Sequence, residues 1–255
     1  MCEEGLLGLL AKGRAYFSST IATVVLVAAL SISPALAQST ESGCGVSATT
    51  HQVLGDAHQL LRGIERAPRN AIRPENLKWE LPIGAATGLL IAEADQPAAD
   101  RIQSPSLIHT ARHWSNIGLA MEIVGAGATW GAGCIEHNHS LAQNGLTALT
   151  AIAAASTLDL ALKLAFNREF PYTAGSQGAF WGGGRSFPSG HAAASFAFAS
   201  AVAHRYPHNR WVKWGAYGLA TGVALSRYPA KRHYLSDILV GSTLGYVTGT
   251  YVAQH

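Results

Sequence analysis

Two polar residues near the C-terminal end of the chain have the spacing of a catalytic pair. His233 and Asp237 are four positions apart, which puts both side chains on one face if a helix begins there. A carboxylate in that position can accept the proton of one imidazole nitrogen, so that the other nitrogen is free to attack an electrophile. An isolated pair at this spacing is more often a surface ion pair, so the surrounding residues decide between the two interpretations.

A second polar cluster directly precedes an Ala-rich segment that we expect to be a helix. The stretch GGGRSFPSGHAAAS, residues 182–195, places Ser189, Gly190 and His191 at the start of that helix. The first turn of a helix has unpaired N–H groups and partial positive charge, and glycine lets the backbone approach a ligand closely. The pattern indicates an anion-binding turn, and an ordinary loop that ends in an N-capped helix is the alternative.

The rest of the chain predicts an all-α fold that brings these clusters together. Strand alternation is absent, and the apolar segments predict a helical bundle of about six core helices. We expect these helices near residues 82–94, 116–135, 144–166, 190–205, 211–226 and 235–253. If the helices are antiparallel neighbours, the 167–189 loop and the end of the 211–226 helix lie at the same end of the bundle. Lys163, His191 and Arg227 then form one site there.

Two motifs in this set resemble those of a known family. Ser226-Arg227, five residues, His233, three residues and Asp237 form the pattern S-R-x5-H-x3-D. With the Pro188-Ser189-Gly190-His191 turn, it resembles two of the three motifs of the type 2 phosphatidic acid phosphatase (PAP2) superfamily. That superfamily includes class A acid phosphatases and vanadium haloperoxidases. The resemblance implies a PAP2-like phosphatase domain over residues 79–255, with the active site at one end of the bundle.

The resemblance also implies a role for each matching residue. His233 is expected to attack phosphorus and form a phosphohistidine, Asp237 to orient it, and His191 to protonate the leaving oxygen and then help to activate water. The phosphate oxygens are expected to be held by Lys163, Ser189, Gly190, Arg227 and Arg168. Phosphoryl transfer mostly requires positioning and charge neutralisation, so this set needs neither a metal nor a cofactor.

The remaining family motif, K-x6-R-P, is imperfect in this chain. Lys163 is followed by Phe170-Pro171, so a phenylalanine stands at the position of the arginine. Arg168 matches the earlier arginine of the Arg-x-Arg-Pro variant of the motif. The substitution removes one expected guanidinium contact to a phosphate oxygen, and Arg168 or Arg185 are the candidates to replace it.

The N-terminus has the pattern of an export signal. Lys12 and Arg14 precede an apolar run of 14 residues, and Ala35-Leu36-Ala37 forms an A-x-A cleavage site. We therefore expect a signal peptide over residues 1–37, followed by a polar lead-in over 38–78; an uncleaved membrane anchor is the alternative. The protein is expected at the periplasmic face of the cell envelope, either membrane-associated or periplasmic. Whether Cys44 and Cys134 form a disulfide is left open, because spacing does not show that they come close.

Composition excludes several other functions. Hydrophobic residues make up 48% of the chain and charged residues 13%, and the net charge of +3 carries no basic stripe, so we expect no nucleic-acid partner. Cys134, His137 and His139 have no matching second half of a metal site.

The basic loop 205–213 lies opposite the expected active site, as the positive-inside rule would require of a membrane protein. Membrane association is therefore expected, whereas the oligomeric state is not predicted.

The expected function is metal-independent hydrolysis of phosphate monoesters or diphosphate esters. Lipid phosphates of the phosphatidic acid or isoprenyl diphosphate type are the expected substrates. One alternative is a vanadate-dependent haloperoxidase, for which 255 residues is short. The other is a non-catalytic relative that binds anionic lipid, an interpretation that Phe170 favours and the intact His191, His233 and Asp237 oppose.

Overall fold

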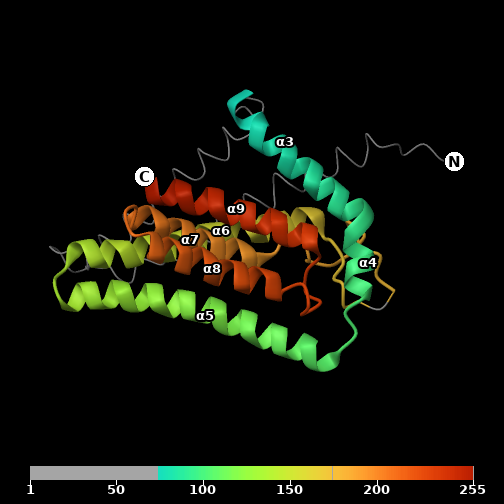
Figure 1. Ribbon diagram of the computed structural model, residues 1–255, viewed down its shortest axis with the longest axis horizontal. Coiled ribbons are helices and arrows are strands. Elements are labelled where there is room, and N and C mark those ends of the chain that lie inside the picture. The colour runs from blue at the N-terminus through green and yellow to red at the C-terminus, as the bar shows by residue number, and fades with distance from the viewer. Residues whose placement is uncertain (1–73, 174, 255) are drawn as a thin grey trace.

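Long helices lie lengthwise beside one another and form an elongated bundle (Figure 1). The computed structural model describes residues 74–173 and 175–254, and among these the ordered elements are all helical, which confirms the predicted all-α bundle. The long helices are α5 (Pro105–Ile135), α6 (His139–Phe166), α7 (Gly190–Arg205), α8 (Arg210–Ser226) and α9 (Leu235–Gln254). The last four agree with the predicted segments to within a few residues. The expected signal peptide and most of the polar lead-in lie outside the described residues.

The helical segment that precedes α5 is longer than the sequence pattern predicts. The α-helix α3 (Pro74–Leu89) continues through the π-helical turn η1 (Leu90–Ala94) into α4 (Asp95–Asp100). The predicted end of this helix at residue 94 is therefore wrong. Pro97 lies in the first turn of α4, where a proline removes no intrahelical hydrogen bond, so the chain stays helical. As a result, α4 lies at one end of the bundle (Figure 1), and its first residue, Asp95, pairs with Arg168 of the 167–189 loop at 2.8 Å.

Helix α5 begins at Pro105 rather than near residue 116. Ser104 caps this helix, because its hydroxyl accepts a hydrogen bond from the amide of Leu107 at 3.4 Å, and Pro105 occupies the first helical position. Polar side chains in this first part of α5 hide the apolar periodicity. The early start places Ser115 and Asn116 on a rigid helix at the same end of the bundle as the catalytic motifs.

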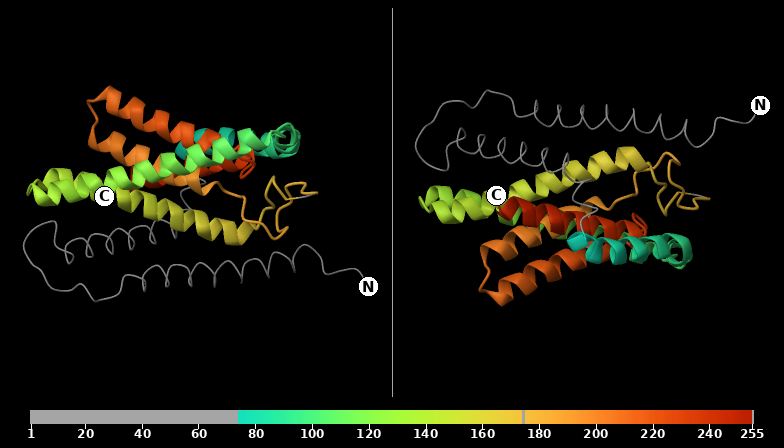
Figure 2. Two further views of the ribbon diagram at one scale, coloured as in Figure 1. Left: turned by 90° about the horizontal axis from the view of Figure 1, so that it is seen from below. Right: turned by 90° about the horizontal axis from the view of Figure 1, so that it is seen from above.

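The centre of the bundle is α7, which packs against α6, α8 and α9 (Figures 1 and 2). Its inward face consists of alanines, and α9 presents glycines to them. A Cβ atom added at Gly245 would lie 2.1 Å from the carbonyl oxygen of Ala193, and one at Gly249 would lie 2.3 Å from that of Ala197. Such close approach is possible only without a side chain. The distance between α7 and α9 is therefore set by the backbone atoms themselves.

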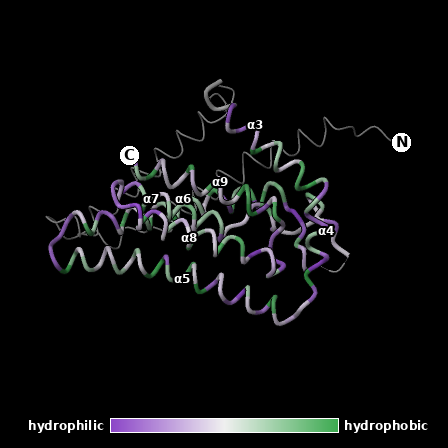
Figure 3. Tube along the Cα trace, viewed as in Figure 1, coloured by the Kyte–Doolittle hydropathy of each residue, from purple (hydrophilic) through white to green (hydrophobic). Residues whose placement is uncertain are grey.

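Hydrophilic residues concentrate at the two ends of the bundle, where the helices are connected (Figure 3). Among the described helices, α6 alone has the length and apolar composition to cross a membrane, with a mean hydropathy of 1.5. However, 56% of its most apolar window is buried inside the bundle, and a helix in a protein core has the same composition.

We expect Gly245→Ala to destabilise the fold by about 1–3 kcal/mol, the usual cost of overpacking, because the new methyl group would collide with the backbone of α7. Gly215→Ala in α8 is the matched control. No atom lies within 4 Å of a Cβ added there, so this change should stabilise the helix by roughly 0.5–1 kcal/mol. Urea unfolding of the two variants measures both effects. Equal stabilities would contradict the close approach of α7 and α9.

Candidate active site

The ends of four helices meet around the predicted site residues. Lys163 lies in the last turn of α6, Ser189 and His191 at the start of α7, Arg227 at the end of α8, and Asp237 in the first turn of α9. The backbone amide of Ser189 donates a hydrogen bond to the carbonyl of Asp237 at 3.0 Å, so the starts of α7 and α9 are in direct contact. The structure thus brings together residues that the chain separates by up to 74 positions, from 163 to 237.

The start of α7 has hydrogen-bond donors without partners. Ser189 is the N-cap residue of α7, yet its side chain makes no capping bond, and its hydroxyl is buried without a hydrogen-bond partner in the described part of the chain. Its exposed fraction is 0%. A buried hydroxyl without a partner is costly unless a ligand satisfies it. Together with the unpaired amides of the first turn, the Ser189 hydroxyl can therefore donate to an anion at this position.

Two cations flank this turn. The Lys163 ammonium donates to Asp159 at 2.6 Å and to the carbonyl of Pro188, which leaves one of its three N–H groups for a ligand. A Cβ at Gly190 would come within 2.7 Å of Asp159, so glycine is needed where α7 meets this ion pair. Burial lowers the pKa of Lys163, and the charge of Asp159 opposes that effect.

Arg227 is the second cation, and α5 holds it. Its guanidinium is 5% exposed and donates to Ser115 Oγ at 2.8 Å and to Asn116 Oδ1 at 3.3 Å. Its Nε–H has no partner among the described residues. Burial, followed by the charges of Arg232 and Arg112, lowers the pKa of Arg227 to about 10, so it stays charged at neutral pH. We refer to Lys163, Ser189, Gly190 and Arg227 together as the anion cradle.

His233 has one ring nitrogen fixed, although not by the residue that the sequence pattern predicts. Its Nδ1 lies 2.7 Å from the carbonyl oxygen of Ser186 and 3.8 Å from Asp237 Oδ2. Since a carbonyl only accepts, Nδ1 carries the proton and Nε2 keeps its lone pair. Burial lowers the pKa of His233 to about 4, against the opposing charge of Asp237, so the ring is neutral at pH 7.

Asp237 does not bond His233 directly because other donors occupy both of its oxygens. Oδ2 accepts from the Ser186 hydroxyl and from the amide of Tyr234 at 2.9 Å, and Oδ1 accepts from Arg168 at 2.5 Å. The expectation that Asp237 takes the imidazole proton is thus corrected. Asp237 fixes Ser186, and the backbone carbonyl of Ser186 orients His233. A serine in a glycine-rich loop gives no sequence signal for this contact.

His191 is held by α5 through Asn116. Its Nε2 lies 2.9 Å from Asn116 Oδ1, the same oxygen that accepts from Arg227. Burial is the largest cause that lowers the pKa of His191, to about 3, followed by the nearby charges of Arg227, His233, Lys163 and Arg232. Asn116 therefore links the side chain expected to act as the acid to a cation of the cradle. The sequence pattern missed the contacts of Asn116, which it placed at the start of the predicted helix 116–135 without assigning it a role.

Arg168 is not available to phosphate, contrary to the expectation from the motif. Its guanidinium is 2% exposed and lies between two carboxylates, with Nη2 2.8 Å from Asp95 and Nη1 2.5 Å from Asp237. It also donates to Ser236 Oγ at 2.7 Å and to the carbonyl of Gly178 at 3.0 Å. Arg168 thus supports the site by holding Asp237. The other candidate, Arg185, is exposed.

The described residues contain no cluster of metal-ligating side chains. No group of three or more His, Cys, Asp or Glu side chains among residues 74–173 and 175–254 could hold a metal ion. Cys134 is disulfide-bonded, and Cys44 lies outside the described residues.

Comparison with known proteins agrees with this geometry. The model of the PAP2 superfamily matches residues 144–255, which contain the cradle, both histidines and Asp237. Residues 144–255 belong to the PAP2 superfamily. The lipid A 1-phosphatase of Porphyromonas gingivalis is 35% identical over 65 residues, which cover 25% of this chain. The match spans only 15% of that relative's length. No solved structure matches the chain.

The chain departs from the PAP2 pattern at Phe170. Its ring centroid lies 6.5 Å from that of His233, at an interplanar angle of 60°. On its other side Phe170 stacks on Tyr172 at 4.9 Å. The position at which the PAP2 motif has an arginine thus places an apolar ring beside His233, and Arg168 does not replace that arginine because two carboxylates hold it.

The depressed pKa of His233 predicts acid sensitivity. The unfolded chain binds a proton at a pKa near 6.5, whereas the folded protein binds it only near 4. The unfolded state therefore takes up protons first, and stability is lost as the pH falls from about 6.5 toward 4. We expect His233→Gln to flatten this part of the stability curve, as measured by urea unfolding between pH 7 and 4. An unchanged slope would mean that other groups cause the acid loss. His208→Gln, an exposed histidine at the far end of the bundle, is the control.

Proposed function

We propose that the protein is a phosphatase of the PAP2 type that hydrolyses lipid phosphates through a phosphohistidine. The observation that carries this proposal is the state of His233, whose Nδ1 is held by the Ser186 carbonyl at 2.7 Å and whose Nε2 is left as a nucleophile. A neutral imidazole with one nitrogen fixed is the form that nucleophilic catalysis requires. The partner-free hydroxyl of Ser189 beside two cations supports phosphate as the ligand.

The reaction would proceed in two steps, transfer of the phosphoryl group to His233 and hydrolysis of the phosphohistidine. In the first, the Nε2 lone pair of His233 forms a bond to phosphorus, the bond from phosphorus to the leaving oxygen breaks, and His191 gives that oxygen a proton. In the second, His191 takes a proton from water, whose oxygen attacks phosphorus and displaces His233. Lys163 and Arg227 would neutralise the charge on the phosphate oxygens in both steps.

His191 must be protonated for the first step, and substrate binding would favour this protonation by raising the pKa of His191. In the free protein, burial and four nearby charges hold its pKa at about 3. A phosphate dianion in the cradle would oppose those charges and raise the pKa of His191. Binding and proton uptake would thus be coupled, and the acid would form in the presence of the substrate.

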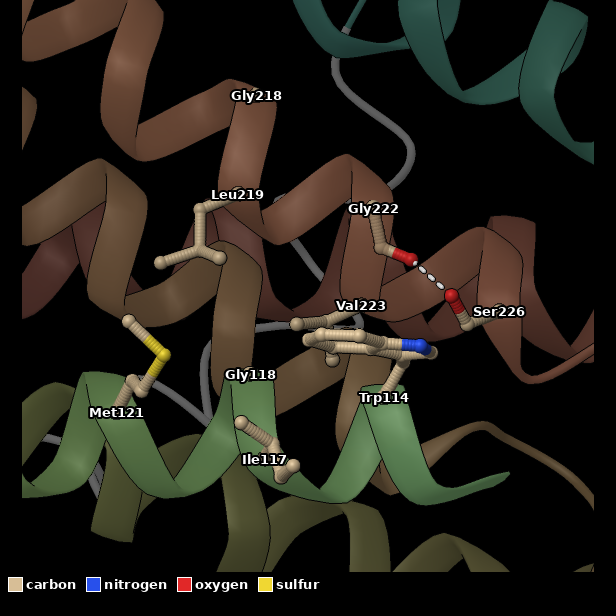
Figure 4. A pocket seen from close by; sticks show the side chains of 9 residues that line it. All are labelled: Trp114, Ile117, Gly118, Met121, Gly218, Leu219, Gly222, Val223 and Ser226. Carbon is tan, nitrogen blue, oxygen red and sulfur yellow. Dashed lines mark hydrogen bonds between the residues drawn. The ribbon is translucent and has the colours of Figure 1, made fainter. Parts of the chain in front are cut away.

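An apolar groove beside the cradle supports a substrate with a hydrocarbon chain. The groove lies between α5 and α8, has a volume of about 340 Å³ and extends from Met121 and Leu219 to Trp114 and Ser226 (Figure 4). Ser226 directly precedes Arg227, and Trp114 directly precedes Ser115, which holds Arg227. The groove therefore ends next to the cradle, as a site for the hydrocarbon chain of a lipid phosphate would. Its other lining residues are Ile117, Gly118, Gly218, Gly222 and Val223.

Exposed apolar side chains on the same helices support association with a membrane. Trp114 is 62% exposed and Met121 61% exposed on α5, and Trp211 and Trp214 are each 74% exposed on α8. Indole rings at a protein surface favour the boundary between lipid and water. A lipid substrate could then enter the groove from the membrane. The periplasmic location is part of this proposal, and the name of the lipid A 1-phosphatase agrees with a lipid phosphate as the substrate.

The first test is phosphate release from phosphatidic acid, an isoprenyl diphosphate and an aryl phosphate in the presence of EDTA. His233→Ala should reduce the rate by roughly 10³-fold or more, because the nucleophile is lost. His208→Ala, an exposed histidine of the turn between α7 and α8, should leave the rate unchanged. Release that EDTA abolishes would contradict the metal-free mechanism. A folded wild type that releases no phosphate from any of the three would favour the non-catalytic, lipid-binding alternative.

The second test blocks the groove with a larger side chain. Gly222 lines it, and no atom lies within 4 Å of a Cβ added there, so Gly222→Leu fits the helix and projects into the groove. We expect kcat/KM for the lipid phosphate to fall about tenfold or more while that for the aryl phosphate changes little, since only the lipid uses the groove. Gly215→Leu is the matched control, because Gly215 is also open but does not line the groove. An equal loss for both substrates would contradict the assignment.

A further inference from the structure

A carboxyl group that the proposed mechanism does not use is buried between α5 and α7. Glu122 lies on α5 and is 1% exposed. Its Oε2 accepts a hydrogen bond at 2.6 Å from the hydroxyl of Ser195 on α7, which is also buried. Its Oε1 is buried without a hydrogen-bond partner in the part of the chain that the structure describes. Glutamate is rarely buried to this extent, so its contact with α7 requires an explanation.

The surroundings of Glu122 suit the neutral acid better than the carboxylate. A buried carboxylate needs a cation or several N–H or O–H donors, whereas Glu122 has one neutral donor, Ser195, among the described residues. Burial accordingly raises the pKa of Glu122 to about 7, and the hydrogen bond from Ser195, which lowers the pKa, is the smaller cause. Near neutral pH a small change in pH therefore decides whether this side chain is charged.

Charges on the neighbouring helices do not compensate Glu122. Helix α5 packs against α6, α8 and α7. The titratable and charged groups of these helices are His139, Asp159 and Lys163 on α6, His191, His204 and Arg205 on α7, Arg210, Lys213, Tyr217 and Arg227 on α8, and His109, Arg112 and His113 on α5 itself. None of them is among the causes that shift the pKa of Glu122, which are burial and the Ser195 hydrogen bond.

Glu122 shares a face of α5 with a residue that holds the site. Ser115, which accepts from the cradle arginine at 2.8 Å, precedes Glu122 by seven residues, or about two turns, so both side chains face the interior. Asn116 beside it contacts His191 at 2.9 Å. On α7, Ser195 follows His191 by four residues, or about one turn. The bond from Ser195 to Glu122 is thus a second polar link between α5 and α7, behind the site.

Ionisation of Glu122 would act on the site through the position of α5. This helix lies along the outer side of the bundle (Figure 1), where it can move without displacing the central α7. A charged Glu122 without a compensating partner would favour a separation of α5 from α7 that admits water. Ser115 and Asn116 would move with the helix, and Arg227 and His191 would lose the groups that hold them.

We propose that Glu122, as a protonated carboxyl group, is a positioning residue that holds α5 against α7, so that Ser115 and Asn116 keep Arg227 and His191 in place. Ionisation of Glu122 loosens α5, and the site then binds phosphate less tightly as the pH rises. The effect on catalysis rests on the proposed phosphatase function, whereas the effect on the anion cradle does not require turnover.

Binding of inorganic phosphate at pH 6 and pH 8, measured by calorimetry, tests this role. Glu122→Gln keeps a neutral acceptor for Ser195 and cannot ionise, so its Kd should lie within about twofold of the wild-type value at pH 6. At pH 8 the wild type should bind about tenfold more weakly than Glu122→Gln, because only about a tenth of Glu122 stays protonated. Titration of phosphate itself affects both proteins alike. The same ratio of Kd values at both pH values would overturn the proposal.

Two further variants separate this role from a general effect on the fold. Ser195→Ala keeps the carboxyl group and removes its bond to α7, so phosphate binding should weaken about threefold already at pH 6. Unchanged binding by folded Ser195→Ala would contradict the proposal even if Glu122→Gln did not fold. Glu136→Gln is the matched control, because it removes an exposed carboxylate at the end of the same helix. It should match the wild type at both pH values.

The pH dependence of turnover separates this proposal from the proposed function. The ratio of kcat/KM for an aryl phosphate in Glu122→Gln to that in the wild type should rise about tenfold between pH 6 and pH 8. If the wild type is active and this ratio stays constant, the phosphatase stands and the role of Glu122 is wrong. If the wild type hydrolyses no phosphate ester, the proposed function fails, and the ratios of the phosphate binding constants decide on Glu122.

Discussion

The arrangement of the site depends on the two ion pairs of the buried Arg168 guanidinium. It is 2% exposed and pairs with Asp95 from α4 and with Asp237 from α9. In a buried environment, removing the guanidinium would leave two carboxylates uncompensated, which costs several kcal/mol. The loop after α6, the short helix α4 and the first turn of α9 are therefore fixed relative to one another. Asp237 in turn has no freedom to shift toward His233.

Both halves of the site are built on the frame that Asp237 provides. Its side chain fixes Ser186, whose carbonyl orients His233, and its own carbonyl accepts from the amide of Ser189. One turn further along α9, a Cβ at Gly241 would lie 2.5 Å from the carbonyl oxygen of Ser189. His233 and the anion cradle are thus both positioned by Asp237. A displacement of α9 along α7 would move both together, and this close backbone contact opposes it.

The sequence predicts the helices and the motif residues well because their signals are local. Apolar segments define α6 to α9, and fixed spacing identifies His191, Arg227, His233 and Asp237. The contacts that orient these residues have no corresponding pattern in the sequence. The Ser186 carbonyl is a backbone group that any residue would present, and Asn116 and Asp95 come from helices that precede the matched segment, residues 144–255. Arg168 was assigned to phosphate because spacing alone does not tell whether a guanidinium faces a ligand or a pair of carboxylates.

The charge balance of the site shows why an anion is needed to complete it. Arg168 and Lys163 have carboxylate partners, whereas Arg112, Arg227 and Arg232 have none among residues 74–173 and 175–254. Burial and the uncompensated positive charge hold the pKa of His191 at about 3, so its ring is uncharged at neutral pH. A multiply charged phosphate ester would offset these cations and make protonation of His191 favourable. The proton on His191 and the anion in the cradle would therefore depend on each other, because each makes the other less costly.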